Sequence, residues 1–250
     1  MIGASATAGF TASEPLGGTN TPWYALSRYV DAAVTVPHEP VQNFGNAFFF
    51  LQPQLIGKQQ IASALTNNPT LIIGLDFPFW FCYGTGKTDE ERLERFDQGL
   101  KLLESIRCPL VLGDLPDASA AVNKMLRPDQ MPTLKAIVAA NQRLKTWAAG
   151  RSQVVVVELS AFMRNATTNH AITVSGYTLA DGQTRMLLQN DALHPTPPGC
   201  AVLALATLDA FQGTRPKVQA QEFLTDPKEI YRRVSQSLKP KTGNPPTAPK

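Results

Sequence analysis

Three short and almost wholly apolar runs constrain the fold of this chain more than any other feature of its sequence. They occupy residues 71–75, 109–112 and 153–159, and the last contains four consecutive valines. Runs of this length suit strands that are buried on both faces and are too short for buried helices. We therefore predict three interior strands.

Helical patterns alternate with these runs. Thr21 and Pro22 provide an N-cap and a first helical residue for a helix with Trp23, Leu26 and Val30 on one face. Further helices are expected over residues 58–65, 89–106 and 132–150, and from Pro198 onward. Strands without a polar face that alternate with amphipathic helices indicate a parallel sheet covered on both sides. The predicted class is α/β, arranged as a three-layer α/β/α sandwich.

The rest of the chain gives the predicted domain organisation. Residues 172–188 read as two short strands joined through Asp181 and Gly182. Thr225, Asp226 and Pro227 are expected to cap a final helix. We predict one domain over residues 1–212, a C-terminal extension with a short helix over 213–238, and a disordered tail over 239–250, which has four prolines and no large apolar residue.

Composition and charge argue against several classes of protein. The chain has 250 residues, 43% apolar and 17% charged, which indicates a globular protein. Its formal charge of +3 arises from the C-terminal end: residues 213–250 contain eight basic and three acidic residues, which leaves the first 212 with a charge of −2. This distribution argues against a nucleic-acid-binding face. The longest apolar stretch, residues 71–83, contains Asp76 and Pro78 and is too short to span a membrane.

Two short motifs near opposite ends of the chain can carry chemistry. Ser5 lies in a turn of small residues between Gly3 and Gly9, where its hydroxyl can stand at a sheet edge and its N–H can face a developing oxyanion. His194 follows Asp191 by three residues, directly before the last helix of the body. A carboxylate at this spacing can orient an imidazole that accepts a hydroxyl proton. The structural alternatives are a loose terminal loop and a loop cap with a solvated imidazole.

Together the two motifs resemble the first and last sequence blocks of the SGNH (GDSL-type) hydrolase family. They read Gly-x-Ser-x-x-x-Gly and Asp-x-x-His-Pro, and Ala4 takes the middle position of the family's Gly-Asp-Ser. The resemblance spans roughly residues 2–212 by order and spacing. It implies a flavodoxin-like sandwich in which Ser5 is the nucleophile, His194 the general base and Asp191 the third triad member. The implied reaction is cleavage of a carboxylic ester of a small molecule, glycan or lipid, with no cofactor and no metal.

The middle blocks of the family match less well. By resemblance, the oxyanion hole comprises the N–H groups of Ser5 and Gly45, with Asn46 as the alternative to Gly45, together with position 76, where Asp76 replaces the family's Asn. An ionised carboxylate repels an oxyanion, so Asp76 must be protonated or turned toward another partner, and capping of backbone N–H groups is an equal alternative. The aromatic residues that follow, Phe77, Phe79 and Trp80, are candidates for pocket lining, with core packing as the alternative.

Two other functions stay open. Residues 84–88 (Gly-Thr-Gly-Lys-Thr) copy the end of a P-loop, but Phe81 occupies the position of its first glycine, and Thr88 with Glu91 reads more simply as a capping box. The Asp76 departure motivates a non-catalytic relative of the family that keeps the fold and binds a ligand. The three cysteines form no metal or disulfide spacing, and His38 and His170 have no partner at useful spacing.

The start of the chain bears on localisation. The sequence as given shows no secretory leader, which fits a cytoplasmic protein but leaves the localisation open. Only Met1 and Ile2 precede the turn at Gly3, where a complete strand is expected. We therefore predict that the natural start lies upstream, with export through a leader as the alternative.

Overall fold

The computed structural model describes residues 1–9, 25–86, 88–213 and 222–237. It is a mixed α/β structure around a three-stranded parallel sheet, whose strands run in the order β1-β2-β3. The strands are β1 (Ile72–Gly74), β2 (Leu110–Gly113) and β3 (Val154–Val157). Their register pairs Ile73 with Val111 and Val111 with Val155. The three strands expected from the apolar runs are therefore confirmed.

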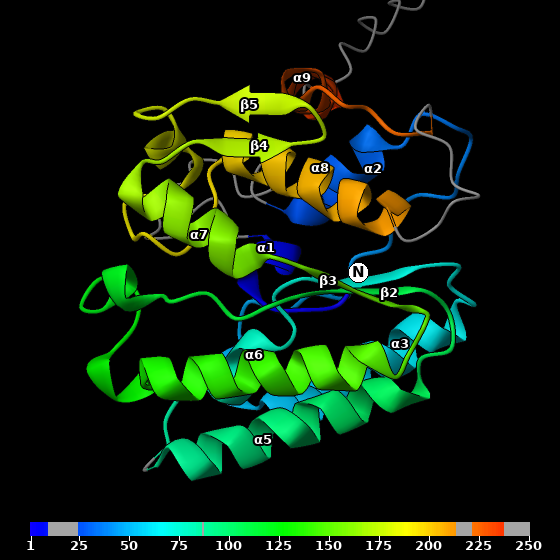
Figure 1. Ribbon diagram of the computed structural model, residues 1–250. Helices are drawn as coiled ribbons and strands as arrows, with labels where there is room; N and C mark the ends of the chain where they lie inside the picture. The colour runs from blue at the N-terminus through cyan, green and yellow to red at the C-terminus, as the bar shows by residue number, and fades with distance from the viewer. Residues whose placement is uncertain (10–24, 87, 214–221, 238–250) are drawn as a thin grey trace, which may run out of the picture.

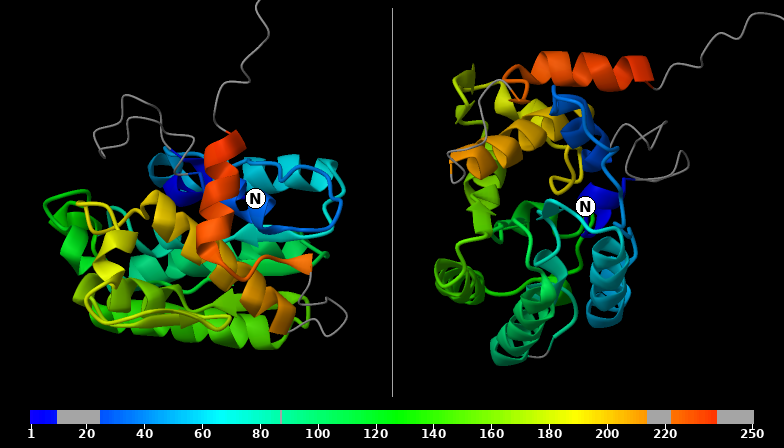
Figure 2. Two further views of the ribbon diagram at one scale, coloured as in Figure 1. Left: turned by 90° about the horizontal axis from the view of Figure 1, so that it is seen from above. Right: turned by 90° about the vertical axis from the view of Figure 1, so that its right-hand side faces the viewer.

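Alternate residues of each strand enter two different apolar cores. Ile73, Val111 and Val155 belong to a core formed with α2, α7, α8 and α9. Ile72 and Leu110 belong to a second core formed with α3, α5 and α6. Figure 1 shows these two groups of helices above and below the sheet, and Figure 2 shows the same arrangement from two further sides. Side chains that alternate across a strand explain why the runs carry no polar face.

Helices α2, α3, α5, α6, α8 and α9 follow the predicted segments with shifts at their ends, whereas α1, α4 and α7 were not predicted. The helices are α1 (Ser5–Ala8), α2 (Leu26–Ala33), α3 (Pro53–Thr66), α4 (Phe79–Cys82), α5 (Asp89–Leu102), α6 (Leu134–Ala149), α7 (Leu159–Thr168), α8 (Pro197–Gly213) and α9 (Pro227–Ser237). Short 3-10 helices cover Phe49–Leu51, Leu103–Ser105, Ser119–Ala121, Pro128–Gln130 and Thr184–Leu187. Thr88 and Thr133 cap α5 and α6 as side-chain acceptors. Thr21 and Pro22 lie outside the described residues.

The two short strands near residue 172 form a hairpin, but the predicted turn is wrong. β4 (Ile172–Val174) pairs antiparallel with β5 (Tyr177–Leu179). The turn between them is Ser175-Gly176, with φ of +49° and +80°, which suits a two-residue type I′ hairpin. Asp181 lies beyond β5, where its Oδ1 accepts the Ala171 N–H at 2.7 Å.

The first residues of the chain lie beside β1. The Ile2 N–H donates to the Ile73 carbonyl at 2.9 Å. On the other side, the Phe44 N–H donates to Met1 and the Asn46 N–H to Gly3, at 2.9 and 3.0 Å. Residues 44–46 and 1–3 therefore continue the sheet beyond β1 and fix where the following turn begins.

The C-terminal helix α9 packs on the same side of the sheet as α2 and α8. Ile230 and Val234 are buried in that core, and the Asp226 carboxylate accepts the Lys228 N–H at 2.9 Å at the start of the helix. This confirms the predicted cap. Residues 239–250 lie outside the described ranges, so the domain boundaries stay predictions.

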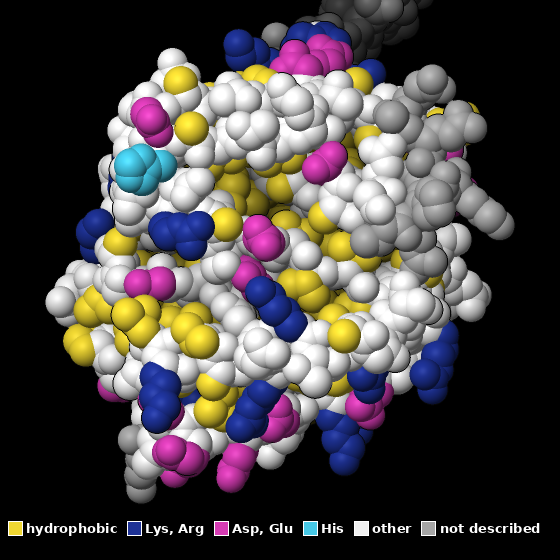
Figure 3. Space-filling model, in the orientation of Figure 1, with side chains coloured by type: hydrophobic (Ala, Val, Ile, Leu, Met, Phe, Trp, Pro, Cys, Tyr) yellow, Lys and Arg dark blue, Asp and Glu magenta, His cyan; other side chains and the backbone are white. Residues whose placement is uncertain are grey.

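The face of the molecule seen in Figure 3 carries no continuous stripe of basic side chains. Over the described ranges, no helix is long and apolar enough to cross a bilayer. Lys and Arg side chains alternate with Asp and Glu over the lower half of this face. Mixed charge of this kind gives no continuous positive field for a phosphate backbone.

Candidate active site

Ser5 is the first residue of the four-residue helix α1, directly after the segment that pairs with β1. Gln60 holds the preceding turn from both sides: its Oε1 accepts the Gly3 N–H at 2.8 Å, and its Nε2 donates to the Gly3 carbonyl at 2.9 Å. Gly3 has φ of +147°, and a Cβ there would lie 2.0 Å from Asp76 Oδ1. Only glycine fits this position. The entry of the chain into α1 is therefore fixed.

Asp76 caps α1. Its Oδ2 accepts the N–H groups of Ala6 and Thr7 at 2.9 and 3.2 Å, and its Oδ1 accepts the Thr7 hydroxyl at 2.6 Å. Burial raises the pKa of the Asp76 carboxyl above its ordinary value, and the hydrogen bonds from Thr7, Ala4 and Ala6 oppose this rise. Both carboxyl oxygens act as acceptors. The prediction that Asp76 belongs to the oxyanion hole is wrong for this geometry, and the capping alternative describes it.

His194 is held by its own turn. Asp191 Oδ1 accepts the N–H groups of Leu193 and His194 at 2.9 and 3.0 Å, and Ala192 adopts φ of +59° to close the turn. The His194 carbonyl accepts the Gln189 N–H at 2.8 Å. Pro197 then starts α8. A local Asx-type turn thus fixes the backbone from which the imidazole projects.

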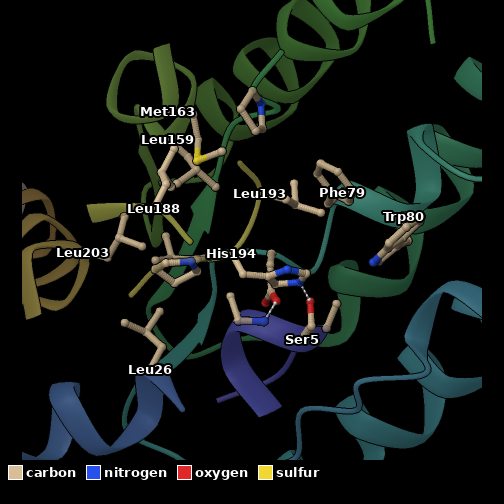
Figure 4. Close-up of a pocket in the computed structure, with 16 residues that line it drawn as sticks. Ser5, Leu26, Phe79, Trp80, Leu159, Met163, Leu188, Leu193, His194 and Leu203 are labelled. Carbon is tan, nitrogen blue, oxygen red and sulfur yellow. Dashed lines mark hydrogen bonds between the residues drawn. The ribbon is translucent and has the colours of Figure 1, made fainter. Parts of the chain in front are cut away.

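The structure brings Ser5, His194 and Asp191 together in a continuous chain of hydrogen bonds. Ser5 Oγ lies 2.8 Å from His194 Nε2, and His194 Nδ1 lies 2.7 Å from Asp191 Oδ2. Figure 4 shows the first of these bonds at the N-terminus of α1. The carboxylate beside Nδ1 selects the tautomer with its proton on Nδ1, which leaves Nε2 as the acceptor for the Ser5 hydroxyl. The imidazole is 3% exposed, so little water competes for either nitrogen.

Asp191 is set to stay ionised. Burial acts to raise the pKa of this carboxyl, but the hydrogen bonds from His194 and Leu193 outweigh it and hold the pKa below the ordinary value. An ionised carboxylate 2.7 Å from Nδ1 stabilises the imidazolium that forms when His194 takes a proton.

The two predicted oxyanion donors differ in whether their N–H groups are already hydrogen-bonded within the protein. The Ser5 N–H donates to no protein group within the described residues, because Asp76 takes the next two N–H groups of α1. The Gly45 N–H already donates to Asn43 Oδ1 at 2.8 Å. Asn43 Nδ2 in turn donates to the Thr7 carbonyl at 2.9 Å and to Ser27 Oγ at 3.0 Å. In this conformation Ser5 offers its N–H to a ligand and Gly45 does not.

A cavity of about 60 Å³ lies beside Ser5 and His194. Figure 4 shows Leu26, Leu188 and Leu203 on one side of the imidazole, and Phe79 and Trp80 on the other. Phe79 and Trp80 thus line the cavity as predicted.

The prediction for Phe77 is wrong. Its side chain is fully buried, with its ring centroid 5.3 Å from that of Phe49 and 5.4 Å from that of Phe81. Asp76 and Phe77 lie in the turn that follows β1, where Phe77 packs into the core and Asp76 faces α1.

The P-loop-like segment is organised around a buried arginine. The Arg92 guanidinium donates to the carbonyls of Gly84, Gly86 and Asp129 at 2.5, 3.2 and 2.7 Å. The Gly84 N–H donates to the Gln130 carbonyl at 3.0 Å. A phosphate-binding loop needs its N–H groups turned toward the ligand, whereas carbonyls line the inner side of this one. This geometry does not favour nucleotide binding, and Lys87 lies outside the described residues.

Sequence reasoning missed Gln60, Thr7 and Asn43, which position the turn that carries Ser5. Their partners are 57, 69 and 36 residues away in the chain. No local spacing signals such contacts.

No further chemical centre stands out in the part of the chain that the structure describes. No group of three or more His, Cys, Asp and Glu side chains there is arranged to hold a metal ion. His38 Nδ1 lies 2.8 Å from the Val36 carbonyl, and His170 lies 3.5 Å from Asp181 on the surface. Within the described residues, Cys82, Cys108 and Cys200 form no disulfide.

Comparison with known proteins adds no relative. No protein-family model matches the sequence, and neither a curated protein nor a solved structure is significantly similar to it.

Proposed function

We propose that this chain is a serine hydrolase of the SGNH (GDSL) type that cleaves carboxylic esters. The observation that carries the proposal is the hydrogen-bonded series from Ser5 Oγ through His194 to Asp191, with distances of 2.8 and 2.7 Å. A hydroxyl, an imidazole and a buried carboxylate in this order form the arrangement that activates a serine for acyl transfer.

The strand arrangement supports the finer fold of the family. Residues 44–46 pair with residues 1–3, these pair with β1, and β2 and β3 follow. In chain order, residues 1–3 are the first segment, residues 44–46 the second and β1 the third. The first segment thus lies between the second and the third. This is the order of a flavodoxin-like sheet, in which ligands bind where the order reverses, beyond the carboxyl ends of the strands. Ser5 stands at that point, directly after the residue 1–3 segment.

The proposed reaction has two steps. In the first, Ser5 Oγ bonds to the acyl carbon while His194 Nε2 takes the hydroxyl proton, and the alkoxy oxygen leaves with that proton as an alcohol. In the second, a water molecule gives a proton to Nε2 and its oxygen bonds to the acyl carbon. The bond to Ser5 Oγ then breaks, and the proton returns to Ser5. Asp191 stays ionised and holds the imidazole tautomer throughout.

The oxyanion of each tetrahedral intermediate faces the Ser5 N–H, the free donor at the start of α1. By accepting the Ala6 and Thr7 N–H groups, Asp76 fixes the direction of this donor. A second donor requires the Gly45 N–H to leave Asn43. This cost motivates the alternative function, a non-catalytic member of the same fold that binds an ester or carbohydrate.

Labelling with a fluorophosphonate separates the two functions. The wild-type protein is expected to react at Ser5, Ser5→Ala to lose the label, and Ser119→Ala, a change at an exposed serine, to keep it. Intact-mass measurement locates the adduct. A wild-type protein that stays unlabelled while folded would favour the binder.

A further inference from the structure

The cavity beside Ser5 and His194 has a chemistry and a size that select one part of an ester. Resting on the proposed ester hydrolysis, we propose that it receives a short, unbranched, uncharged acyl chain of at most about six carbons. The proposal depends on three properties of the cavity, namely its walls, its volume and its closed end.

The walls are hydrocarbon. The polar side-chain groups among the lining residues belong to Ser5, Asp76, His194 and Trp80, whose indole N–H is a donor. Asp76 already accepts three hydrogen bonds from α1, and His194 is bonded on both ring nitrogens. At the end of the cavity away from Trp80, a carboxylated, hydroxylated or sugar-like acyl group would lose its water and gain no new partner, which disfavours its binding. The walls therefore select an alkyl chain.

The volume sets the length of that chain. A water molecule needs about 10–15 Å³ of such a cavity. A cavity of about 60 Å³ thus holds at most about four to six groups of that size. A methylene group is similar in size to water, so a long fatty-acyl chain exceeds the available space.

One end of the cavity is closed by packed core. Leu26, Met163, Leu188 and Leu203 come from α2, α7, the segment before His194 and α8, and each is at most 5% exposed. Lengthening the cavity in this direction means separating helices that share one core. At the other side Trp80 lies 5.5 Å, between ring centroids, from Phe50, which is 39% exposed.

The closed end suits the acyl group rather than the alcohol. The acyl carbon stays bonded to Ser5 Oγ from the first step until the second step releases it, whereas the alcohol must leave after the first. A cavity that ends in packed side chains can hold the retained group but gives the alcohol no exit. The alcohol is therefore assigned to the side of Trp80.

The test is a chain-length profile on one leaving group. For the wild-type protein with p-nitrophenyl acetate, butyrate, hexanoate and decanoate, we expect kcat/KM to rise about fourfold per methylene up to butyrate. We expect it to fall at least tenfold between butyrate and decanoate. Leu203→Ala should move the optimum toward hexanoate, and Leu134→Ala, the same change at a residue 63% exposed on α6, should not. Met163→Ala serves as a second widening variant if Leu203→Ala does not fold.

Other outcomes overturn the proposal separately from the proposed function. A flat profile, or one that rises to decanoate, with Ser5 still labelled by fluorophosphonate, refutes the short-acyl assignment alone. The short-acyl assignment is also refuted if kcat/KM among acetate esters varies with the size of the alcohol but does not vary with the length of the acyl chain. Absence of both labelling and hydrolysis refutes the proposed function and this inference with it.

Discussion

Replacing Asp191 by Asn tests how the candidate triad depends on one carboxylate. In the structure Asp191 Oδ1 accepts two backbone N–H groups and Oδ2 faces His194 Nδ1 at 2.7 Å. In Asp191→Asn the amide oxygen can keep the two backbone bonds, so the amide N–H₂ is turned toward Nδ1. Nδ1 must then accept, and the ring proton moves to Nε2.

The magnitude follows from this change of tautomer. A proton on Nε2 points at Ser5 Oγ, 2.8 Å away, so His194 can no longer accept the hydroxyl proton. The tautomer that can accept the Ser5 proton carries its own proton on Nδ1, and in this variant that N–H would face the N–H₂ group of the new amide. The variant also lacks the carboxylate that stabilises the imidazolium. The same substitution in a Ser-His-Asp protease lowers kcat about 10⁴-fold, equivalent to about 5.4 kcal/mol of activation free energy. We expect a loss of 10³- to 10⁴-fold in kcat here.

The assay is steady-state hydrolysis of p-nitrophenyl butyrate, with thermal melting followed in parallel. Asp181→Asn is the matched control, because that exposed carboxylate also accepts a backbone N–H and lies away from the triad. It should keep wild-type turnover. Turnover of Asp191→Asn within tenfold of the wild-type value, in a protein with unchanged melting, would refute the assigned role of Asp191.

Three further predictions concern the support of the site and the core. Burial raises the pKa of Asp76 above 3.8, so the folded state binds more protons and the free energy of unfolding falls as the pH rises above about 4. In Asp76→Asn this pH-dependent loss of stability should disappear. Urea titrations should therefore show the free energy of unfolding of the variant, relative to that of the wild type, rising from pH 4 to 7. A difference between the two proteins that does not change with pH contradicts the raised pKa of Asp76. Arg92→Met should lower the free energy of unfolding by about 2–4 kcal/mol in the same titrations, because several buried carbonyls lose their donor, and an unchanged midpoint would argue against this role. Gly99→Ala places a Cβ 2.5 Å from the Phe81 ring and should cost about 1–3 kcal/mol despite the better helix propensity of alanine; a stabilised variant would show that the ring can move.

The sequence predicted the strands and most helices because their signals are local. The apolar runs became β1, β2 and β3, and Thr88 and Thr133 cap α5 and α6 from adjacent positions. Helix α7 was missed because its cap comes from elsewhere. Asp114, at the end of β2, accepts the Ser160 N–H at 2.6 Å and the Ser160 hydroxyl at 2.5 Å. A cap supplied by a residue that follows another strand gives no signal in the sequence next to the helix.

The same distinction divides the candidate site. Asp191 and His194 are three residues apart, so their pairing could be predicted from spacing, and Ser5 was identified from its small-residue turn. The hydrogen bonding of Asp76 depends on partners that are 69 and 70 residues away in the chain. Whether the Gly45 N–H is available depends on the orientation of the Asn43 amide. Neither could be deduced from neighbouring letters, since a carboxylate or an amide near a turn has several partners within reach.

The separation of Ser5 and His194 by 189 positions has a consequence for how the protein becomes active. The turn that carries Ser5 is synthesised before the segment that carries His194. At roughly 5–20 residues per second, synthesis of the chain between them takes about 10–40 s. During that interval Ser5 has no base. Recovery of esterase activity during refolding should therefore lag behind helix formation and report the docking of the C-terminal segment rather than the formation of secondary structure.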